Sequence, residues 1–255
     1  MVLADLPVGF LFTLAIASLG VYGIVLAGWA SNNKYALLGG IRSTAQMISY
    51  EIAMGMSLLP VLLLAGNVTL NSIVLQQSAM YLPNVLTLTI SFFIFLVAAF
   101  AETNRLPFDL PEAESELIAG YHTEYSAMKF SLFFIAEYAN MVTASALIST
   151  IFFGGWNLPF LADEVGAVAG WMVALSILWF FAKVLFFLFF FMWIRWTLPR
   201  FRYDQLMALG WKFMIPLALI YIVVTASAIL ALDAFYGRRD FVFAGLLFAL
   251  NAVLS

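Results

Sequence analysis

Six long apolar runs constrain the fold of this chain more than any other feature of its sequence. A helix needs about 20 apolar residues to cross the ~30 Å hydrocarbon core of a bilayer. Each run approaches or exceeds that length, and we place them at residues 7–29, 45–66, 85–103, 130–153, 167–194 and 211–232. The sequence therefore predicts an all-α, polytopic integral membrane protein with about six transmembrane helices.

The composition agrees with a membrane protein and excludes several classes of function. Of the 255 residues, 65% are apolar and 10% are charged, whereas a soluble domain has roughly 25% charged residues. The net charge of −3 gives no reason to expect a nucleic-acid partner. The absence of cysteine excludes thiolate metal sites and iron–sulfur ligation, and the sequence holds no nucleotide-binding glycine motif. We expect no metal site.

Neither a repeat nor a linker divides the chain, so we expect one transmembrane domain over residues 1–255. The first apolar run is flanked by Asp5 instead of basic residues and is too long for a signal peptide, so it should remain in the mature protein. The tail, residues 233–255, has no assigned structure. Its apolar part, Phe241–Leu254, is short for a span and is expected to form an interfacial or packed helix.

The distribution of basic residues predicts the orientation of the spans. The connections after the first, third and fifth runs hold eight of the eleven basic residues, whereas connections 67–84 and 154–166 hold none. By the positive-inside rule, the basic side faces the cytoplasm, or the matrix of a mitochondrion, and both termini lie on the opposite side. Arg238 and Arg239 conflict with this orientation, but they lie in the tail, where topology signals are weaker.

The segment Ala101–Phe130 concentrates the charge of the chain. Beside Arg105, Lys129 and the only histidine, His122, it contains six of the fourteen acidic residues. These six are Glu102, Asp109, Glu112, Glu114, Glu116 and Glu124. A membrane protein that gathers scarce charge in one place indicates where its functional site lies.

Two interpretations of these acids remain open. Pro107 and Pro111 favour a helix that starts near Pro111, on which Glu112 and Glu116 share a face and Glu114 points away. The helix macrodipole alone would stabilise acids in such a first turn. Alternatively, closely spaced carboxylates titrate together, which suits proton uptake coupled to a distant event. Cation binding is a weaker alternative, because the spacing matches no EF-hand loop.

Four ionisable groups lie inside the predicted spans or at their ends: Glu51, Glu102, Glu137 and Lys183. A charge at the bilayer centre costs at least ~2.5–3.5 kcal/mol, so each group must be paired, neutral or in contact with water. A neutral acid bonded to a helix carbonyl would explain any single one. Four together favour a connected polar path, in which Lys183 is a counter-charge to one of the acids.

Two basic segments complete the candidate site. Trp193–Leu206 contains Arg195, Arg200 and Arg202, and the segment 28–46 contains Lys34 and Arg42 among aromatic and small residues. Both are typical of a positive-inside anchor with interfacial aromatic residues, and the second also of an ordinary cytoplasmic hairpin.

Three motifs carry a resemblance to a known family: GWASNNKYALLGGIRSTAQMISYE, AETNRLPFDLPEAESELIAGYHTEYSAMKF and WIRWTLPRFRYDQLM. They closely resemble the H subunit of bacterial proton-translocating NADH–quinone oxidoreductase, the counterpart of subunit 1 of mitochondrial complex I. The resemblance runs across all six predicted spans, roughly residues 5–232. Family members carry about two further apolar segments upstream, and this chain begins after them.

The resemblance implies a subunit that helps form the quinone chamber and couples quinone reduction to proton translocation in respiratory electron transport. It implies no catalytic residue on this chain alone. Residues matching the chamber and its acidic loop are Glu102, Arg105, Asp109, Glu112, Glu114, Glu116, Glu124, Arg42, Arg195 and Arg200. The proton path matches Glu51 and Glu137, and we add Lys183 from the reasoning above.

The resemblance also implies the surroundings of the chain. Its substrate would be a quinone, ubiquinone or menaquinone, while FMN and the iron–sulfur clusters would lie on partner subunits. Its partners would be the peripheral-arm quinone-module subunits, small membrane subunits of complex I and the lipid bilayer. The expected location is the bacterial cell inner membrane, in preference to the mitochondrial inner membrane.

Two alternatives belong to other classes of function. The homologous membrane subunit of a membrane-bound hydrogenase uses the same scaffold without NADH, and the neighbouring genes distinguish it. An independent secondary transporter predicts broken helices in matched halves of the chain, and we see no inverted repeat in the sequence.

Overall fold

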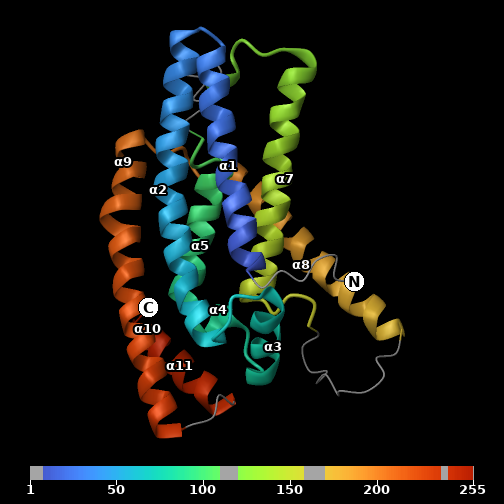
Figure 1. Cartoon of the computed structure of the whole chain (residues 1–255), viewed down its shortest axis with the longest axis vertical. Helices are drawn as coiled ribbons and strands as arrows, with labels where there is room; N and C mark the ends of the chain where they lie inside the picture. Colours follow the sequence, from blue (N-terminus) through green and yellow to red (C-terminus); the bar gives the residue numbers. More distant parts are fainter. Residues whose placement is uncertain (1–7, 110–119, 158–169, 237–240, 255) are drawn as a thin grey trace.

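The computed structural model describes residues 8–109, 120–157, 170–236 and 241–254. The described residues form helices joined by short connections, without a β-strand (Figure 1). The helices are α1 (Gly9–Ala30), α2 (Lys34–Ala65), α3 (Leu70–Met80), α4 (Asn84–Thr87), α5 (Thr89–Glu102), η1 (Gly120–His122), α7 (Ala127–Phe152), α8 (Gly170–Thr197), α9 (Tyr203–Ala208), η2 (Leu209–Met214), α10 (Ile215–Tyr236) and α11 (Phe241–Leu254).

Five helical runs within the described residues are long and apolar enough to cross a membrane. They are α1, α2, α7, α8 and the continuous run Tyr203–Phe235, which joins α9, η2 and α10. Helices α1 and α8 bury few of their side chains. Large apolar side chains of α8, such as Phe181 and Phe186, are exposed. Such surfaces suit contact with lipid. The protein is therefore an all-α, multi-pass membrane protein, as predicted.

The third predicted span, residues 85–103, is not one continuous helix. Leu88, with φ −132° and ψ 53°, breaks it into α4 and α5. At 14 residues, α5 is about 21 Å long, which is less than the hydrocarbon thickness. An apolar run predicts that a segment avoids water but does not specify its backbone conformation, so the sequence pattern did not reveal the break at Leu88.

The predicted connection 28–46 was also wrong, because α2 begins at Lys34. Asn33 caps the helix by accepting a hydrogen bond from the backbone N–H of Tyr35 at 3.0 Å. The preceding turn is tight, with Asn32 at φ +51°. Gly28 allows it, since a Cβ there would lie 2.8 Å from the carbonyl oxygen of Ala36. At 32 residues, α2 is about 48 Å long.

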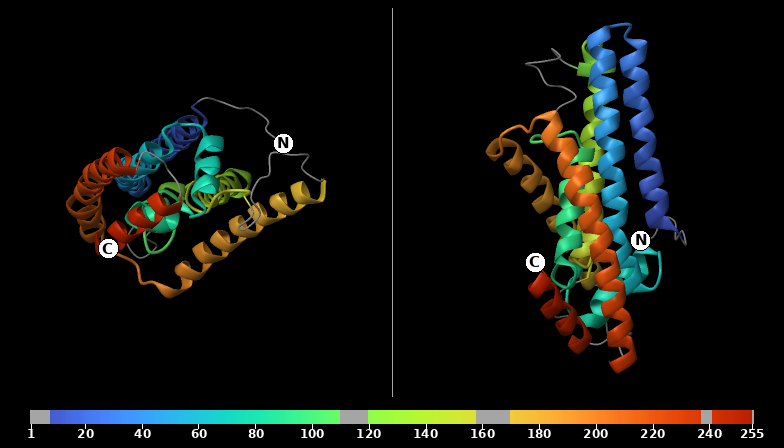
Figure 2. Two further views of the ribbon diagram at one scale, coloured as in Figure 1. Left: turned by 90° about the horizontal axis from the view of Figure 1, so that it is seen from below. Right: turned by 90° about the vertical axis from the view of Figure 1, so that its left-hand side faces the viewer.

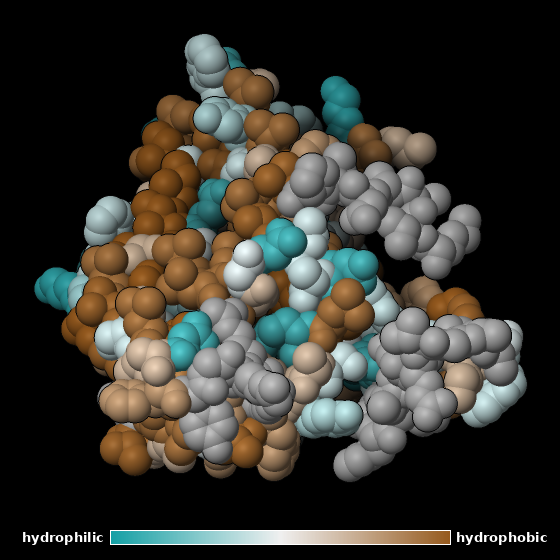
Figure 3. All heavy atoms as spheres, turned by 60° about the horizontal axis from the view of Figure 1, so that its bottom comes forward, coloured by the Kyte–Doolittle hydropathy of each residue, from teal (hydrophilic) through white to brown (hydrophobic). Residues whose placement is uncertain are grey.

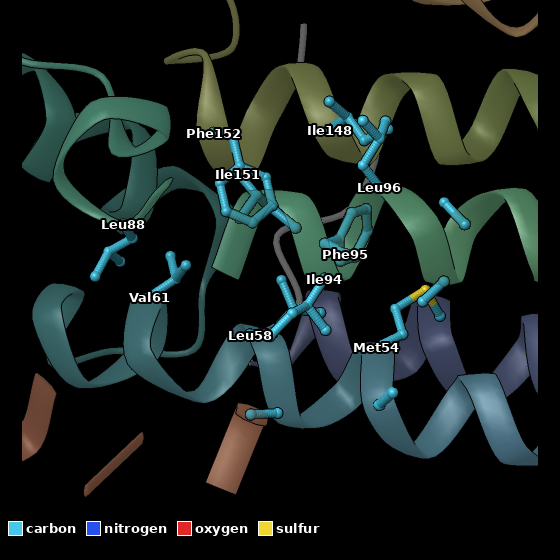
Figure 4. Close-up of a cluster of buried hydrophobic side chains, with 14 of the residues drawn as sticks. Met54, Leu58, Val61, Leu88, Ile94, Phe95, Leu96, Ile148, Ile151 and Phe152 are labelled. Atoms are coloured by element: carbon cyan, nitrogen blue, oxygen red, sulfur yellow. The ribbon is translucent and has the colours of Figure 1, made fainter. Parts of the chain in front are cut away.

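Helix α2 is the central helix of the bundle and packs against α1, α5 and α10 (Figures 1 and 2). The core between α2, α5 and α7 is apolar, and Figure 4 shows its side chains interdigitated. Phe95 and Phe152 are fully buried there, with ring centroids 5.5 Å apart. This packing fixes α5 between its neighbours and thereby fixes the place where α5 ends.

At the end of the bundle that holds α3, α4 and α11, buried side chains satisfy backbone carbonyls that helix ends leave open. Gln77 donates to the carbonyls of Thr150 and Ile151 at the end of α7. Asn251 of α11 donates to the carbonyl of Thr87, beside the break at Leu88. Within a bilayer each of these carbonyls needs a partner inside the protein. Figure 3 brings this end forward and shows polar side chains gathered near its middle among apolar ones.

The tail therefore contains a packed helix, which is one of the two predicted forms. Its residues Phe243, Ala244, Leu247 and Asn251 recur at helical spacing and are fully buried. The predicted connection 67–84 differs from a simple loop, because most of it forms α3 and the start of α4.

Candidate functional site: a buried charged corner at the end of α5

The chain leaves α5 through a corner, residues 101–109, that α2 holds in place. The side-chain amide of Gln46 donates to the carbonyls of Ala101 and Phe108, both at 2.9 Å, and to the side-chain oxygen of Asn104 at 3.3 Å. Asn104 has φ +49° and also contacts Met47. The corner is therefore tied to one turn of α2 by side-chain hydrogen bonds.

Arg105 at this corner forms an ion pair with Glu137 of α7. Nε of Arg105 lies 2.5 Å from Oε1 of Glu137, and the two side chains are 8% and 15% exposed. The guanidinium carbon also lies 4.7 Å from the ring centroid of Tyr138, within cation–π range. Glu137, predicted from its position in an apolar run, thus has a cationic partner from another element.

Glu102, the last residue of α5, faces a second carboxylate. Its side chain is 9% exposed, and among the described residues no side chain forms a hydrogen bond or an ion pair with it. It interacts electrostatically with Glu51 of α2. A row of four ionisable groups therefore extends across the bundle from α2 to α7: Glu51, Glu102, Arg105 and Glu137.

The corner also meets the basic segment that follows α8. Nη2 of Arg200 donates to Oδ2 of Asp109 at 3.2 Å, and the backbone N–H of Phe201 donates to the carbonyl of Pro107 at 3.2 Å. The rings of Phe108 and Phe201 lie 5.7 Å apart. Since Gln46 belongs to the first motif, the structure brings together all three motifs that the sequence singled out.

The other predicted basic residues lie differently. Arg42 of α2 packs against the ring of Tyr203 at 5.8 Å and so joins α2 to the start of α9. Arg195 is exposed at the end of α8 and forms no ion pair with any described residue. Of the basic residues predicted to face the acids, the structure therefore places Arg200 at the corner and leaves Arg195 outside it.

Glu124 lies well away from the corner. Its carboxylate accepts a hydrogen bond from Asn33 at 2.7 Å, at the turn between α1 and α2. Asn33 precedes Gln46 by thirteen residues of α2, a distance of about 20 Å along the helix. Close contact between Gly39 and Gly120, where a Cβ on Gly39 would lie 2.9 Å from Cα of Gly120, holds this returning segment on α2. Glu112, Glu114, Glu116 and the helix predicted near Pro111 lie outside the described residues.

Among the described residues, Lys183 pairs with backbone carbonyls and with no acid, which differs from its predicted role as a counter-charge. Its ammonium donates to the carbonyls of Phe153 at 2.7 Å and Gly155 at 2.8 Å, just beyond the end of α7. The ammonium thus lies near the C-terminal end of α7, where a positive charge also interacts favourably with the helix dipole. The sequence suggested an acid as the partner of Lys183, because residue types alone do not reveal which backbone carbonyls lie near a side chain.

His122, the last residue of η1, packs among aromatic side chains. Its ring packs against Tyr121, Phe130 and Phe134, at centroid distances of 5.0, 5.3 and 6.4 Å. Burial lowers the pKa of His122, because desolvation disfavours the charged imidazolium. Over the described residues no group of three or more acidic or histidine side chains is arranged to hold a metal ion.

Comparison with known proteins now decides the family. The sequence profile of the family described as NADH dehydrogenase matches residues 1–226. The chain belongs to the NADH dehydrogenase family. It is 51% identical over 226 residues to an H subunit of the NADH-quinone oxidoreductase of Cytophaga hutchinsonii, covering 89% of this chain and 66% of that protein.

Two further members of the NADH dehydrogenase family are similarly close. The chain is 57% identical over 221 residues to the H subunit of the NADH-quinone oxidoreductase of Leptospira biflexa, covering 86% of this chain and 60% of that protein. It is 55% identical over 224 residues to the corresponding protein of Protochlamydia amoebophila, covering 88% and 64%. The chain thus spans less than two thirds of the length of these curated relatives. The charged corner lies wholly inside the region that the family profile covers.

Proposed function

We propose that this chain is a membrane subunit of a proton-translocating NADH–quinone oxidoreductase, bacterial respiratory complex I. In this role it helps form the quinone chamber and couples quinone reduction to proton movement, without catalysing a reaction alone. The observation that carries the proposal is the row of ionisable groups across the bundle, in which Arg105 joins Glu137 and Glu102 faces Glu51. The names of the relatives support the same assignment.

The geometry supplies a physical means of coupling. Carboxylates that interact electrostatically cannot change protonation independently, because a proton gained by one changes the affinity of its neighbour. Glu102 and Glu51 are such a pair, and Arg105 connects the same corner to Glu137. Reduction of a quinone adds two electrons, whose negative charge is neutralised by the uptake of two protons, so it draws protons from groups that line the chamber. We propose that Glu102 receives this change and that Glu51 and Glu137 transmit it.

The chamber side of the corner is the part that meets the segment after α8. Asp109 and Arg200 form an ion pair there, and we propose that they, together with Arg42, Arg195 and the acids Glu112, Glu114, Glu116 and Glu124, line or border the quinone chamber. The substrate is ubiquinone or menaquinone. Because the chain has no cysteine to bind iron–sulfur clusters, these clusters and FMN belong to partner subunits in this proposal.

The assembly and orientation follow from the same assignment. The partners are the peripheral-arm quinone-module subunits and the small membrane subunits, in the bacterial cell inner membrane. The connections rich in Lys and Arg face the cytoplasm, where the peripheral arm lies, and both termini lie on the other side. The corner is then near the cytoplasmic surface, within reach of the peripheral arm.

Glu102→Gln tests the proposal in the assembled membrane complex. We expect it to reduce quinone-linked NADH oxidation and the proton pumping that accompanies it, while NADH oxidation by an artificial acceptor is unchanged. Asp204→Asn is the control, because it makes the same carboxylate-to-amide change at an exposed acid of α9 that has no role in the proposal. Equal quinone-linked pumping in wild type and Glu102→Gln would contradict the proposal.

A further inference from the structure

Gln46 stands out among the buried polar residues because one side chain binds three acceptors on the charged corner. It is fully buried on α2, and its amide nitrogen reaches the carbonyls of Ala101 and Phe108 and the side chain of Asn104. These contacts connect residues 55 to 62 positions apart in the sequence. The acceptors of Ala101 and Phe108 flank Glu102 and Arg105, and that of Asn104 lies between them.

The hydrogen bonds of Gln46 fix the path of the corner more tightly than apolar packing would. An apolar side chain of the same size fills the space but tolerates small displacements, whereas an amide N–H requires its acceptor at hydrogen-bonding distance and roughly in line. The carbonyl of Ala101 belongs to the last turn of α5, and that of Phe108 lies beyond Arg105. Both ends of the intervening segment are therefore anchored to one atom of α2.

The groups between these anchors depend on accurate placement. Arg105 approaches Glu137 to 2.5 Å, and Glu102 lies within electrostatic reach of Glu51. Interactions between charges inside a protein weaken with separation, and misplacement by about 1 Å costs up to about 100-fold in rate at an active site.

We propose that Gln46 is a positioning residue for proton coupling, which sets the place of Glu102 and Arg105 relative to the carboxylates of α2 and α7. Gln46 neither binds quinone nor carries a proton in this role. The inference rests on the proposed function, since it assigns Gln46 a part in the same coupling.

The chain offers a matched control in Gln77 of α3. Gln77 is 4% exposed, and its amide nitrogen also donates to three carbonyl oxygens, those of Ile73, Thr150 and Ile151. It lies at the other end of the bundle, beside α4 and the end of α7 (Figure 1). Gln46→Met and Gln77→Met each remove a buried amide that donates to three acceptors, and Gln77→Met also removes the acceptor of the Asn84 N–H. Only Gln46→Met changes a residue that touches the charged corner.

The test measures both variants in the assembled membrane complex. NADH oxidation by an artificial acceptor gives the amount of complex, and quinone-linked oxidation and protons pumped per NADH are then expressed per complex. We expect Gln46→Met to lower quinone-linked turnover by about 10- to 100-fold and to lower the proton-to-NADH ratio. Gln77→Met should reduce the amount of complex but leave both quantities per complex at the wild-type level.

If quinone-linked turnover and the proton-to-NADH ratio per complex were the same in the two variants, the positioning role would be overturned. Hydrogen bonds that serve stability alone would lower the amount of complex in both variants and leave these two quantities equal. If Gln46→Met does not assemble, Gln46→Asn and Gln77→Asn replace the pair, since they keep the amide but withdraw it by one methylene. Glu102→Gln separates this inference from the proposed function. Normal pumping in Glu102→Gln would contradict both the proposed function and the positioning role of Gln46. Impaired pumping in Glu102→Gln together with normal coupling in the Gln46 variant would contradict the positioning role alone.

Discussion

Arg105 and Glu137 form a buried ion pair that joins the end of α5 to the middle of α7, with Nε 2.5 Å from Oε1. The contact brings together residues that are 32 positions apart and separated in sequence by most of the acidic segment Ala101–Phe130. It places a permanent positive charge next to a carboxylate in a scaffold that is otherwise apolar. A buried pair of this kind is sensitive to the loss of one partner, because the remaining charge keeps its desolvation cost without its counter-charge.

Glu137→Gln should consequently destabilise the protein by about 3–5 kcal/mol, since it leaves the guanidinium of Arg105 buried without that carboxylate. Thermal and denaturant unfolding of the purified protein in detergent would measure this loss. Glu124→Gln, at an exposed position, should change stability by less than about 1 kcal/mol. A loss at Glu137 no larger than that at Glu124 would show that the ion pair is not a significant contact.

Gly39→Ala should destabilise the protein by about 1–3 kcal/mol, because the added Cβ would lie 2.9 Å from Cα of Gly120 and 3.0 Å from the backbone nitrogen of Tyr121. Neither backbone atom can move without shifting η1. Gly55→Ala is the control in the same helix: a Cβ there has no neighbour within 4 Å, so better helix propensity should stabilise the protein by roughly 0.5–1 kcal/mol. Opposite shifts in melting temperature are expected, and shifts of the same sign would contradict the close approach.

His122 should make stability depend on pH in the mildly acidic range. Its pKa in the folded protein lies below its ordinary value near 6.5, so the unfolded chain binds a proton at a higher pH than the native chain does. Stability is then greatest above pH ~6.5 and falls as the pH decreases toward the lowered pKa. The difference in unfolding free energy between wild type and His122→Gln, followed from pH 8 downward to about 5, isolates this contribution because the chain has one histidine. A pH-independent difference would mean that burial does not lower the pKa.

Lys183→Met should destabilise the protein without altering proton coupling. The substitution leaves the carbonyls of Phe153 and Gly155 without their ammonium donor, at a cost of about 1–3 kcal/mol for each buried acceptor. We expect a lower unfolding temperature and a smaller amount of assembled complex, with protons pumped per NADH unchanged in the complexes that form. A reduced ratio in intact complexes would instead support the proton path on which the sequence placed Lys183.

Much of the fold could be predicted, because apolar length is a strong signal in a membrane protein. The spans α1, α7, α8 and Tyr203–Phe235 overlap their predicted ranges, and the tail helix was foreseen as packed or interfacial. The break at Leu88 and the start of α2 at Lys34 were missed, because both are set by contacts with other elements. Asn251 satisfies the carbonyl beside the break from 164 residues away, and no local pattern reports such a partner.

The sequence predicted most of the residues of the candidate site, but it did not predict which residues pair with each other. Scarce charge in apolar surroundings singled out Glu51, Glu102, Glu137 and Lys183, and three of these belong to the row across the bundle. Gln46 was missed, since an uncharged residue in a helical motif carries no compositional signal. Lys183 was assigned the wrong partner, because its acceptors are backbone oxygens.

The sequence by itself determined that this chain is a helical membrane protein of the NADH dehydrogenase family with its ionisable groups gathered near a few loops. Length, hydropathy and motif identity are properties of the chain alone, so they need no knowledge of packing. The tertiary structure decided which charge meets which: Arg105 with Glu137, Glu102 with Glu51, and Lys183 with the carbonyls beyond the end of α7. Pairing depends on which helices pack side by side and where each one ends, and those are outcomes of long-range contacts between distant segments.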